Sequence, residues 1–231
     1  MFSPADLFSL DQTEHAVLFE GCDVAWTALS RLSDYVQSKV QPGLLNRCEG
    51  VAWIGEQVFI GEGTVVEDGA MIKGPAIIGK NCQIRHNAYI RENVIIGDHC
   101  VVGNSCELKS AWLFNGCQVP HFNYVGDSIL GYKAHLGAGV KISNLKIVPG
   151  NVAIEHEGRW IDSGLRKFGA LIGDGAQIGC NVVLNPGSIV GRNAMIYPNV
   201  SWRGVLPAAH VAKNRAAVQV VALTEKSTRK G

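Results

Sequence analysis

The sequence predicts an all-β protein, a solenoid in which short parallel strands stack on one another. An aliphatic residue returns at every sixth position from Ile54 to Leu108, and the same period returns from Ile172 to Ile196. The chain also holds 27 glycines among 231 residues and only 18% charged residues, which favours a turn-rich fold and excludes a disordered chain. Such short repeats cannot fold alone, so each must pack on its neighbours.

The repeated aliphatic position defines the predicted core. Its members are Ile54, Ile60, Val66, Ile72, Ile78, Ile84, Ile90, Ile96, Val102 and Leu108, followed later by Ile172, Ile178, Leu184, Val190 and Ile196. A small residue usually stands two positions earlier, as at Ala70, Cys82 and Ala176. This period does not fit the helical repeat, so it favours strands joined by turns. The pattern resembles the hexapeptide-repeat left-handed β-helix, in which three repeats form one triangular coil. The single-stranded left-handed course is implied by the resemblance alone, because parallel crossovers are usually right-handed.

Residues 1–49 are expected to form a short helical cap over the open end of the solenoid. Asp11 and Glu14 are spaced like a capping box that opens a first helix. A second helix is indicated by an apolar stripe at Leu29, Leu32, Val36 and Val40, and Pro42 and Gly43 end it. The β-helix domain is expected to span residues 50–205, and residues 206–231 are expected to form a tail.

Composition excludes several classes of protein. A formal net charge of +1 gives no reason to expect nucleic acid as a partner, although the tail carries Lys226, Arg229 and Lys230. No apolar run is long enough to cross a membrane, and the N-terminus has no signal-peptide pattern, so a cytoplasmic location is expected. The seven cysteines include no C-x-x-C pair, which argues against a disulfide framework and a zinc finger.

A row of cations is predicted along one corner of the solenoid. Lys73, Arg91 and Lys109 each follow the core position and are 18 residues apart, which places them on successive coils about 4.8 Å apart. Like charges this close repel one another unless an anion lies across them, and a phosphate suits Arg and Lys. The alternative is that these side chains extend into water or pair with acids such as Glu92 and Glu107.

The period of six stops at residue 115 and resumes at Leu130, Leu136 and Ile142. Residues 115–125 are therefore expected to form a loop beside the cationic corner, a common place for chemistry. His121 lies in this loop beside Phe122 and Tyr124 and is the candidate catalytic residue. A purely structural histidine is the alternative.

A longer set of residues resembles the acetyltransferase domain of the bifunctional glucosamine-1-phosphate N-acetyltransferase and N-acetylglucosamine-1-phosphate uridyltransferase, over residues 50–205. The residues that carry the resemblance are Arg91, the runs Glu107-Leu108-Lys109, His121-Phe122-Asn123-Tyr124-Val125-Gly126-Asp127 and Leu136-Gly137-Ala138-Gly139, then Asn144, Lys167-Phe168 and Ile172-Gly173-Asp174. Nothing in the sequence resembles the Gly-rich nucleotide loop of the uridyltransferase half.

The resemblance implies a homotrimer that transfers an acetyl group from acetyl-CoA to an amino-sugar 1-phosphate, without a metal. His121 would be the general base, for which an imidazole suits neutral pH. The residues implied to bind the substrate are Lys73, Arg91, Glu107, Lys109, Tyr124, Asn144 and Lys167. On the coenzyme side the resemblance implies Gly137 and Ala138, whose backbone N–H groups would stabilise the thioester oxyanion, together with Cys180 and Pro198.

The chain departs from the pattern of this family at four places. His135 stands where the family has Asn, Cys180 where it has Ser, and Pro198 where it has Ala. Residues 145–166 are an insertion whose apolar alternation around a Pro-Gly turn predicts a β-hairpin that overhangs the pocket. The acceptor sugar, and whether an amine or a hydroxyl is acetylated, stay open.

Two other functions fit parts of the sequence. A γ-class carbonic anhydrase would hold zinc with three histidines, but His86 and His121 lack the close third partner, since residue 126 is glycine. A non-catalytic solenoid that binds a sugar nucleotide, or assembles with a nucleotidyltransferase, is the other alternative.

Overall fold

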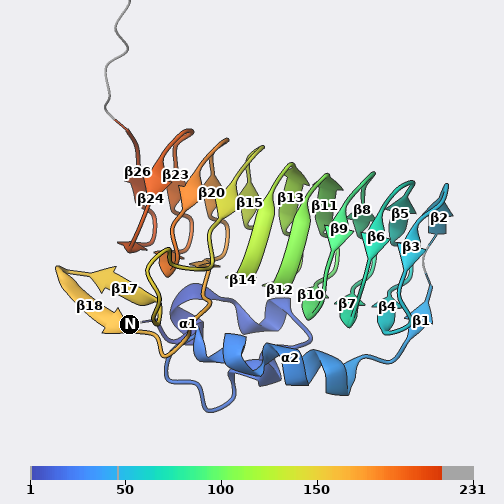
Figure 1. Ribbon diagram of the computed structural model, residues 1–231, viewed down its shortest axis with the longest axis horizontal. Coiled ribbons are helices and arrows are strands. Elements are labelled where there is room, and N and C mark those ends of the chain that lie inside the picture. Colours follow the sequence, from blue (N-terminus) through green and yellow to red (C-terminus); the bar gives the residue numbers. More distant parts are fainter. Residues whose placement is uncertain (1, 46, 215–231) are drawn as a thin grey trace, which may run out of the picture.

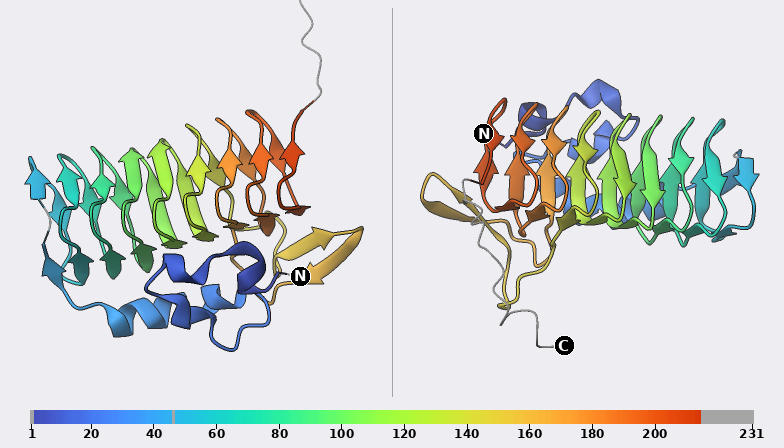
Figure 2. Two further views of the ribbon diagram at one scale, coloured as in Figure 1. Left: turned by 180° about the vertical axis from the view of Figure 1, so that it is seen from behind. Right: turned by 90° about the horizontal axis from the view of Figure 1, so that it is seen from above.

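The computed structural model describes residues 2–45 and 47–214. Most of these residues form a parallel β-solenoid, and the N-terminal helices lie along one side of it (Figures 1 and 2). Strands of successive coils pair in parallel and in register, as Ile60 does with Ile78 and Ile78 with Ile96. The predicted solenoid of short parallel strands is confirmed.

Each coil contributes strands to three faces. Face 1 consists of β3 (Trp53–Ile54), β6 (Met71–Ile72), β9 (Tyr89–Ile90), the first halves of β12 (Glu107–Leu113) and β14 (Tyr124–Leu130), β16 (Lys141–Ile142), β21 (Val183–Leu184) and β24 (Ser201–Trp202). Face 2 consists of β2 (Arg47–Glu49), β5 (Val65–Glu67), β8 (Gln83–Ile84), β11 (Val101–Asn104), β13 (Gln118–His121), β15 (His135–Leu136), β20 (Gln177–Ile178), β23 (Met195–Ile196) and β26 (Val211–Ala212). Face 3 consists of β1 (Gly43–Leu44), β4 (Val58–Ile60), β7 (Ala76–Ile78), β10 (Val94–Ile96), the second halves of β12 and β14, β19 (Ala170–Ile172), β22 (Ser188–Val190) and β25 (Val205–Leu206).

The predicted core residues fill the space between the three faces. Every predicted aliphatic residue except Ile54 is at most 2% exposed, and Ile54, at the first coil, is half-buried. Four of the seven cysteines, Cys82, Cys100, Cys106 and Cys117, lie in the same cluster as small core residues. Burial of apolar area on this scale is the main stabilising contribution to such a fold.

The expected loop at residues 115–125 is wrong, because the solenoid continues through this segment as β13 and the start of β14. The core of the solenoid also continues through it, with the buried residues Leu113, Val119, Val125 and Leu130. Two sides of the solenoid are five residues long instead of six, since β12 and β14 turn their corner at single residues, Ser110 and Asp127, both with a φ of 46°. The two shortened sides interrupt the period of six in the sequence. With the coil continued in this way, His121 lies at a corner of the solenoid.

The N-terminal arm, residues 2–39, does not cap the open end of the solenoid but lies along face 3. It consists of α1 (Pro4–Leu7), two 3-10 helices at Leu10–Gln12 and Ala16–Phe19, and α2 (Thr27–Lys39). Trp26, Leu32 and Val36 of the arm pack on outward-facing residues of face 3, among them Trp112 and Ile129, in one buried cluster. The arm lies on this face because its outward residues are apolar and need a cover.

The helices of the arm differ in part from those expected. The capping box lies at Ser3 and Asp6 of α1, and Asp11 is part of a 3-10 helix. The second expected helix is α2, whose buried residues include Leu32 and Val36 and which ends before Pro42.

The insertion forms the expected hairpin, but its turn lies at Glu157–Gly158 and not at Pro149–Gly150. Its strands are β17 (Ala153–His156) and β18 (Arg159–Asp162), paired antiparallel. Val152 and Ile154 join the apolar cluster of the arm, so the hairpin lies beside the N-terminus and not over the cationic corner (Figure 1).

The ends of the solenoid lie outside the range expected for it. The first strand pair includes Gly43, and β26 still pairs with β23 at Val211–Ala212. The basic residues Lys226, Arg229 and Lys230 lie outside the described residues.

Candidate functional site

The predicted cationic corner, Lys73, Arg91 and Lys109, lies on successive coils at the junction of faces 1 and 3. The backbone N–H of Lys73 donates to the carbonyl of Ile90, and that of Arg91 donates to the carbonyl of Leu108, at 2.7 and 2.9 Å. Lys109 pairs in register with Gly126 on the next coil. The spacing of 18 residues therefore predicted the stacking of these three positions correctly.

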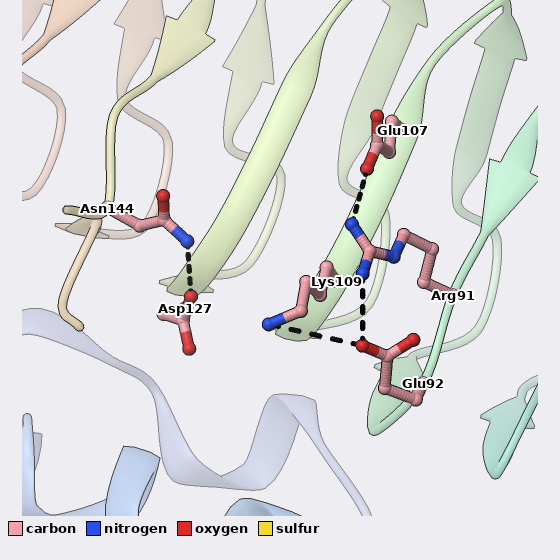
Figure 3. A network of polar contacts seen from close by, with 6 residues as sticks. All are labelled: Arg91, Glu92, Glu107, Lys109, Asp127 and Asn144. Atoms are coloured by element: carbon pink, nitrogen blue, oxygen red, sulfur yellow. Dashed lines mark hydrogen bonds and ion pairs between the residues drawn. The ribbon is translucent and has the colours of Figure 1, made fainter.

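Two acids, Glu92 and Glu107, pair with two of the three cations, Arg91 and Lys109 (Figure 3). Arg91 Nη1 lies 2.9 Å from Glu107 Oε1, and Arg91 Nη2 lies 3.2 Å from Glu92 Oε1. Lys109 Nζ lies 4.0 Å from the same Glu92 oxygen. Pairing with Glu92 and Glu107 was the alternative expectation for this row, and it is what Arg91 and Lys109 do in the isolated chain.

This network shifts the pKa of Arg91 and of Glu92. The hydrogen bond from Arg91 to Glu107 raises the pKa of Arg91, with Glu92 adding to the effect. Burial works to raise the pKa of Glu92, yet that pKa lies below its usual value, because its own backbone N–H, Arg91 and Lys109 favour the carboxylate. Arg91 Nε and Glu92 Oε2 are buried and have no hydrogen-bond partner within the described residues. A buried polar atom without a partner is costly, so these two atoms are places where a ligand gains a contact.

Tyr124, Asn144 and Asp127 form a second cluster one and two coils further along. Asn144 Nδ2 donates a hydrogen bond to Asp127 Oδ2 (Figure 3). A Cβ added to Gly126 would lie 2.7 Å from both Asn144 Nδ2 and the Tyr124 hydroxyl, so the absence of a side chain there lets these groups meet. Burial, and then the charges of Glu107 and Asp127, raise the pKa of Tyr124. Asp127 belongs to the motif that carries the family resemblance, but the sequence indicated no role for it.

Backbone contacts place Lys167 close to Asn144. It forms an antiparallel bridge with Leu145, and the next residue, Phe168, donates its N–H to the carbonyl of Asn144 at 3.0 Å. The Lys167 side chain is exposed. The structure therefore places Lys167 next to Asn144 in space, although 22 residues of insertion separate them in the chain.

His121 lies at the junction of faces 2 and 1, on a line with the residues expected on the coenzyme side. Backbone N–H groups link the line coil by coil: Gly139 donates to His121, Asn181 to Ala138, and Asn199 to Cys180, each at 2.9 Å. The His121 line, defined as His121, Ala138, Cys180 and Pro198, thus occupies one corner of four coils. Cys180 and Pro198 are exposed, and Ala138 is half-buried.

The turn that carries His121 is fixed by Asn123, which is 2% exposed. Its side chain accepts the His121 N–H at 3.0 Å and donates to the carbonyl of Gly137 at 2.7 Å. No role was predicted for Asn123, although an Asn side chain commonly fixes a turn by hydrogen bonds to the backbone. The His121 side chain is exposed and makes no hydrogen bond within the described part of the chain.

The backbone around Ala138 offers one free donor. The N–H groups on either side are used, since Gly137 donates to Ile178 and Gly139 to His121. Across residues 2–45 and 47–214, the structure has no acceptor for the N–H of Ala138. His135, one of the departures from the family pattern, lies on face 2, and its burial lowers its pKa.

The structure thus brings the predicted residues together as two lines at the two edges of face 1. One edge carries the cationic corner with Asn144, and the other carries the His121 line. Tyr124 and Glu107 lie in register on the outer side of the strands between them. Within the described residues no three histidine, cysteine or acidic side chains are placed to hold a metal, and no helix there is long and apolar enough to span a membrane.

Two stretches of the chain match known protein families. Residues 72–164 match the family model "GMPPB C-terminal domain", and residues 169–201 match "Bacterial transferase hexapeptide (six repeats)". The hexapeptide match confirms the predicted fold class, a left-handed parallel β-helix.

Among curated proteins, the chain is 40% identical over 92 residues to the "Bifunctional sugar-1-phosphate nucleotidylyltransferase/acetyltransferase" of Sulfurisphaera tokodaii, which is 40% of this chain and 23% of that one. It is 38% identical over 93 residues to the "Bifunctional protein GlmU" of Methanococcus vannielii, which is 40% of this chain and 22% of that one. The chain therefore spans less than a quarter of the length of these relatives. The predicted resemblance to such bifunctional proteins is confirmed.

Among solved structures, the UDP-N-acetylglucosamine acyltransferase from Campylobacter jejuni aligns with a TM-score of 0.43 and 16% identity, over 76% of this chain and 69% of that one. A likeness this distant bears on neither activity nor substrate.

Proposed function

We propose that this chain is an acetyltransferase that moves the acetyl group of acetyl-CoA to the amine of an amino-sugar 1-phosphate. The observation that carries this proposal is the placement of a cation row and a histidine line at the two edges of one face. The name of the Sulfurisphaera tokodaii relative, which includes both a sugar 1-phosphate and an acetyltransferase, supports it.

The acceptor is proposed to bind at the cationic corner. Arg91 and Lys109 hold the phosphate, and the unpartnered Arg91 Nε is a further donor for its oxygens. Glu107 orients the Arg91 fork through its hydrogen bond. Tyr124, Asn144 and Lys167 lie next along the corner, where a sugar ring attached to that phosphate extends. Asp127 fixes the Asn144 amide, so that its Oδ1 is free to accept a sugar hydroxyl.

Acetyl-CoA is proposed to lie along the His121 line. The neutral imidazole of His121 takes a proton from the amine as the amine nitrogen attacks the thioester carbonyl carbon. The carbonyl oxygen becomes an oxyanion, for which the free N–H of Ala138 is a donor. The C–S bond then breaks, and the coenzyme leaves as a thiol once it accepts the proton that His121 carries. Gly137, Cys180 and Pro198 form the surface on which the coenzyme arm lies.

A homotrimer is part of the proposal, because the two lines lie at opposite edges of face 1. The His121 ring has no partner within the described residues of its own chain, which leaves it free to face a neighbouring copy. The N-terminal arm covers face 3, so faces 1 and 2 remain for contacts between copies. In this arrangement the His121 line of one copy meets the cationic corner of the next.

The test is acetyl transfer from acetyl-CoA to glucosamine 1-phosphate, followed by chromatography of the acetylated sugar. His121→Ala is expected to lower kcat about 100-fold or more, the usual contribution of a general base, while acetyl-CoA binding and the trimer in light scattering persist. His210→Ala, a matched control at an exposed histidine on the last coil, should keep full activity.

Two results would contradict the proposal. Wild-type protein that binds acetyl-CoA and sugar phosphates without turnover would favour the non-catalytic solenoid. Equal activity of His121→Ala and His210→Ala would remove His121 as the base. Transfer to a hydroxyl of a sugar phosphate that lacks the amine would instead identify an O-acetyltransferase, because the same base serves that chemistry.

A further inference from the structure

A cavity of about 590 Å³ lies at the beginning of the cationic corner, next to the site described above. Trp53, Glu56, Gln57, Lys73 and Gly74 are among its lining residues. Lys73 belongs to both the cavity and the cationic corner, so the cavity continues the row of cations toward the first coil. Neither the acetyl transfer nor the binding of a single phosphate gives this cavity a role.

Lys73 differs from the other two cations of the corner. Arg91 and Lys109 are compensated by Glu92 and Glu107. The Lys73 side chain is exposed and, within the described residues, forms no ion pair and donates no hydrogen bond. Charge on the corner is therefore balanced at Arg91 and Lys109 and unbalanced at Lys73, which is where a second anionic group is attracted most strongly.

Trp53 presents an aromatic surface beside Lys73. Its side chain is 53% exposed, although a large apolar ring is usually more buried. The neighbouring corner residue is Gly55, where a Cβ would lie 2.3 Å from the carbonyl oxygen of Lys73. Only glycine fits there, because the backbones of the two coils lie so close together at this corner.

The distance between the cavity and Tyr124, where the sugar is proposed to bind, follows from the register of face 1. Trp53 pairs with Met71, Met71 with Tyr89, Tyr89 with Glu107, and Glu107 with Tyr124. Four strand spacings of ~4.8 Å place Trp53 about 19 Å from Tyr124. The order along the solenoid is then Tyr124 at the proposed sugar site, two cations paired with acids, one cation without an ion pair within the described residues, and an exposed aromatic ring.

We propose that the acceptor is a nucleoside-diphosphate amino sugar, with its base on Trp53. The proposal rests on the proposed acetyltransferase function and names the substrate class of the same site. The phosphate attached to the sugar lies at Lys109 and Arg91, and the second phosphate lies at Lys73. The base stacks on the Trp53 ring, a contact that tolerates every base because each has a flat π-face. Glu56 and Gln57 are placed to bind the ribose hydroxyls, for which a carboxylate is a suitable acceptor.

A sugar monophosphate would occupy only about half of the distance from Tyr124 to Trp53. It reaches from Tyr124 to the cation pair and touches neither Lys73 nor Trp53. The two acceptor classes are therefore distinguished by residues that only the longer one contacts.

The experiment compares glucosamine 1-phosphate with UDP-glucosamine as acceptors, by kcat/KM. The wild type is expected to prefer UDP-glucosamine by about 10-fold or more, and Trp53→Ala is expected to reduce that preference by about 10-fold, the usual effect of losing one stacked base. Lys73→Met should reduce it as well. Trp160→Ala, a matched control at another exposed tryptophan, on the hairpin, should leave the preference unchanged.

A binding measurement separates this inference from the proposed function. Calorimetric titration with UDP, GDP and ADP should show binding to the wild type and to Trp160→Ala, and binding weakened about 10-fold in Trp53→Ala. If neither acceptor is acetylated while UDP binding depends on Trp53, the proposed function fails and the nucleotide site stands. Absence of nucleoside-diphosphate binding, or an acceptor preference that Trp53→Ala does not change, would overturn the inference.

Discussion

Replacement of Asp174 by alanine tests how the N-terminal arm is held on face 3. Asp174 lies at a corner between faces 3 and 2 and is 8% exposed. Its Oδ1 accepts the N–H of Tyr132 at 2.8 Å, a contact between coils, and its Oδ2 accepts the N–H of Ser9 in the arm at 2.7 Å. Arg192 Nη1 lies 3.5 Å from the same Oδ2. Asp174→Ala therefore removes one bond within the solenoid, one of the hydrogen bonds that tie the arm to it, and the ion pair with Arg192.

The magnitude is worked out against Asp98, which occupies the same corner position in an earlier coil. Asp98 Oδ1 accepts the N–H of Lys80 at 2.7 Å, the equivalent of the Tyr132 contact. A hydrogen bond to a charged group contributes about 1.5–3 kcal/mol. Asp98→Ala should thus cost about 1.5–3 kcal/mol, and Asp174→Ala about twice as much, 3–6 kcal/mol, because two such bonds are lost. The difference between the variants measures the contacts of Asp174 Oδ2 with Ser9 of the arm and with Arg192.

The assay combines urea unfolding with hydrogen exchange of the arm, residues 2–39. Unfolding of a repeat protein need not be two-state, so exchange in the arm is the more direct measurement. Asp174→Ala should speed exchange in residues 2–39 well beyond the effect of Asp98→Ala. Equal losses of stability in the two variants, with unchanged exchange in the arm, would refute the reasoning.

Three further predictions follow from the geometry. Gly126→Ala places a Cβ against the Tyr124 hydroxyl and Asn144, so kcat/KM for acetyl transfer should fall about 10- to 100-fold. An unchanged kcat/KM would show that neither group touches the substrate. The pKa of Cys82 is raised by its hydrogen bond with Cys100 and by burial, and burial raises the pKa of Cys100 and Cys106. Iodoacetamide at pH 8 should therefore label the native protein at the exposed Cys48 and Cys180 and reach these buried cysteines only after unfolding, which mass spectrometry distinguishes. Burial lowers the pKa of His15, so the folded state binds a proton there less readily than the unfolded state, and the free energy of unfolding should decrease as the pH falls below the unfolded pKa of about 6.5. His15→Gln should weaken this dependence of the free energy of unfolding on pH, and an unchanged dependence would show that other groups cause it.

The core of the solenoid was predictable because its period is simple. An aliphatic residue at every sixth position has no helical interpretation, and each such residue except Ile54 is buried as expected. The stacking of Lys73, Arg91 and Lys109 followed from the same period. The ion pairs of these cations with Glu92 and Glu107 were only the alternative expectation, because the sequence pattern does not show the direction in which a glutamate side chain points.

The position of the N-terminal arm was missed although the sequence holds a signal for it. The residue before the core position is apolar on every third side, at Phe59, Ile77, Ile95, Trp112, Ile129, Leu171, Ile189 and Val205. On the other two faces the same position holds mostly polar or mixed residues, such as Gln83, Glu107 and Gln177. A face that is apolar on both sides needs a cover, which the two amphipathic segments before residue 40 supply.

The segment around His121 was mistaken for a loop because two sides of the coil are one residue short. A search for a strict period of six loses the register at Ser110 and again at Asp127, where single residues turn the corner. The core positions Leu113 and Val119 were present but out of phase. A shift of one residue is enough to hide a coil from a search for a fixed repeat.

The insertion at residues 145–166 does not disturb the strand pairing of the coils on either side of it. Ile142 pairs directly with Leu184, and Leu130 with Ile172, as closely in register as coils with no insertion between them. The corner therefore acts as a point of attachment at which the lineage can lengthen, shorten or exchange a peripheral segment while the interior stays constant. Diversification of such proteins is expected to proceed by remodelling corners, with the stack itself conserved as a frame.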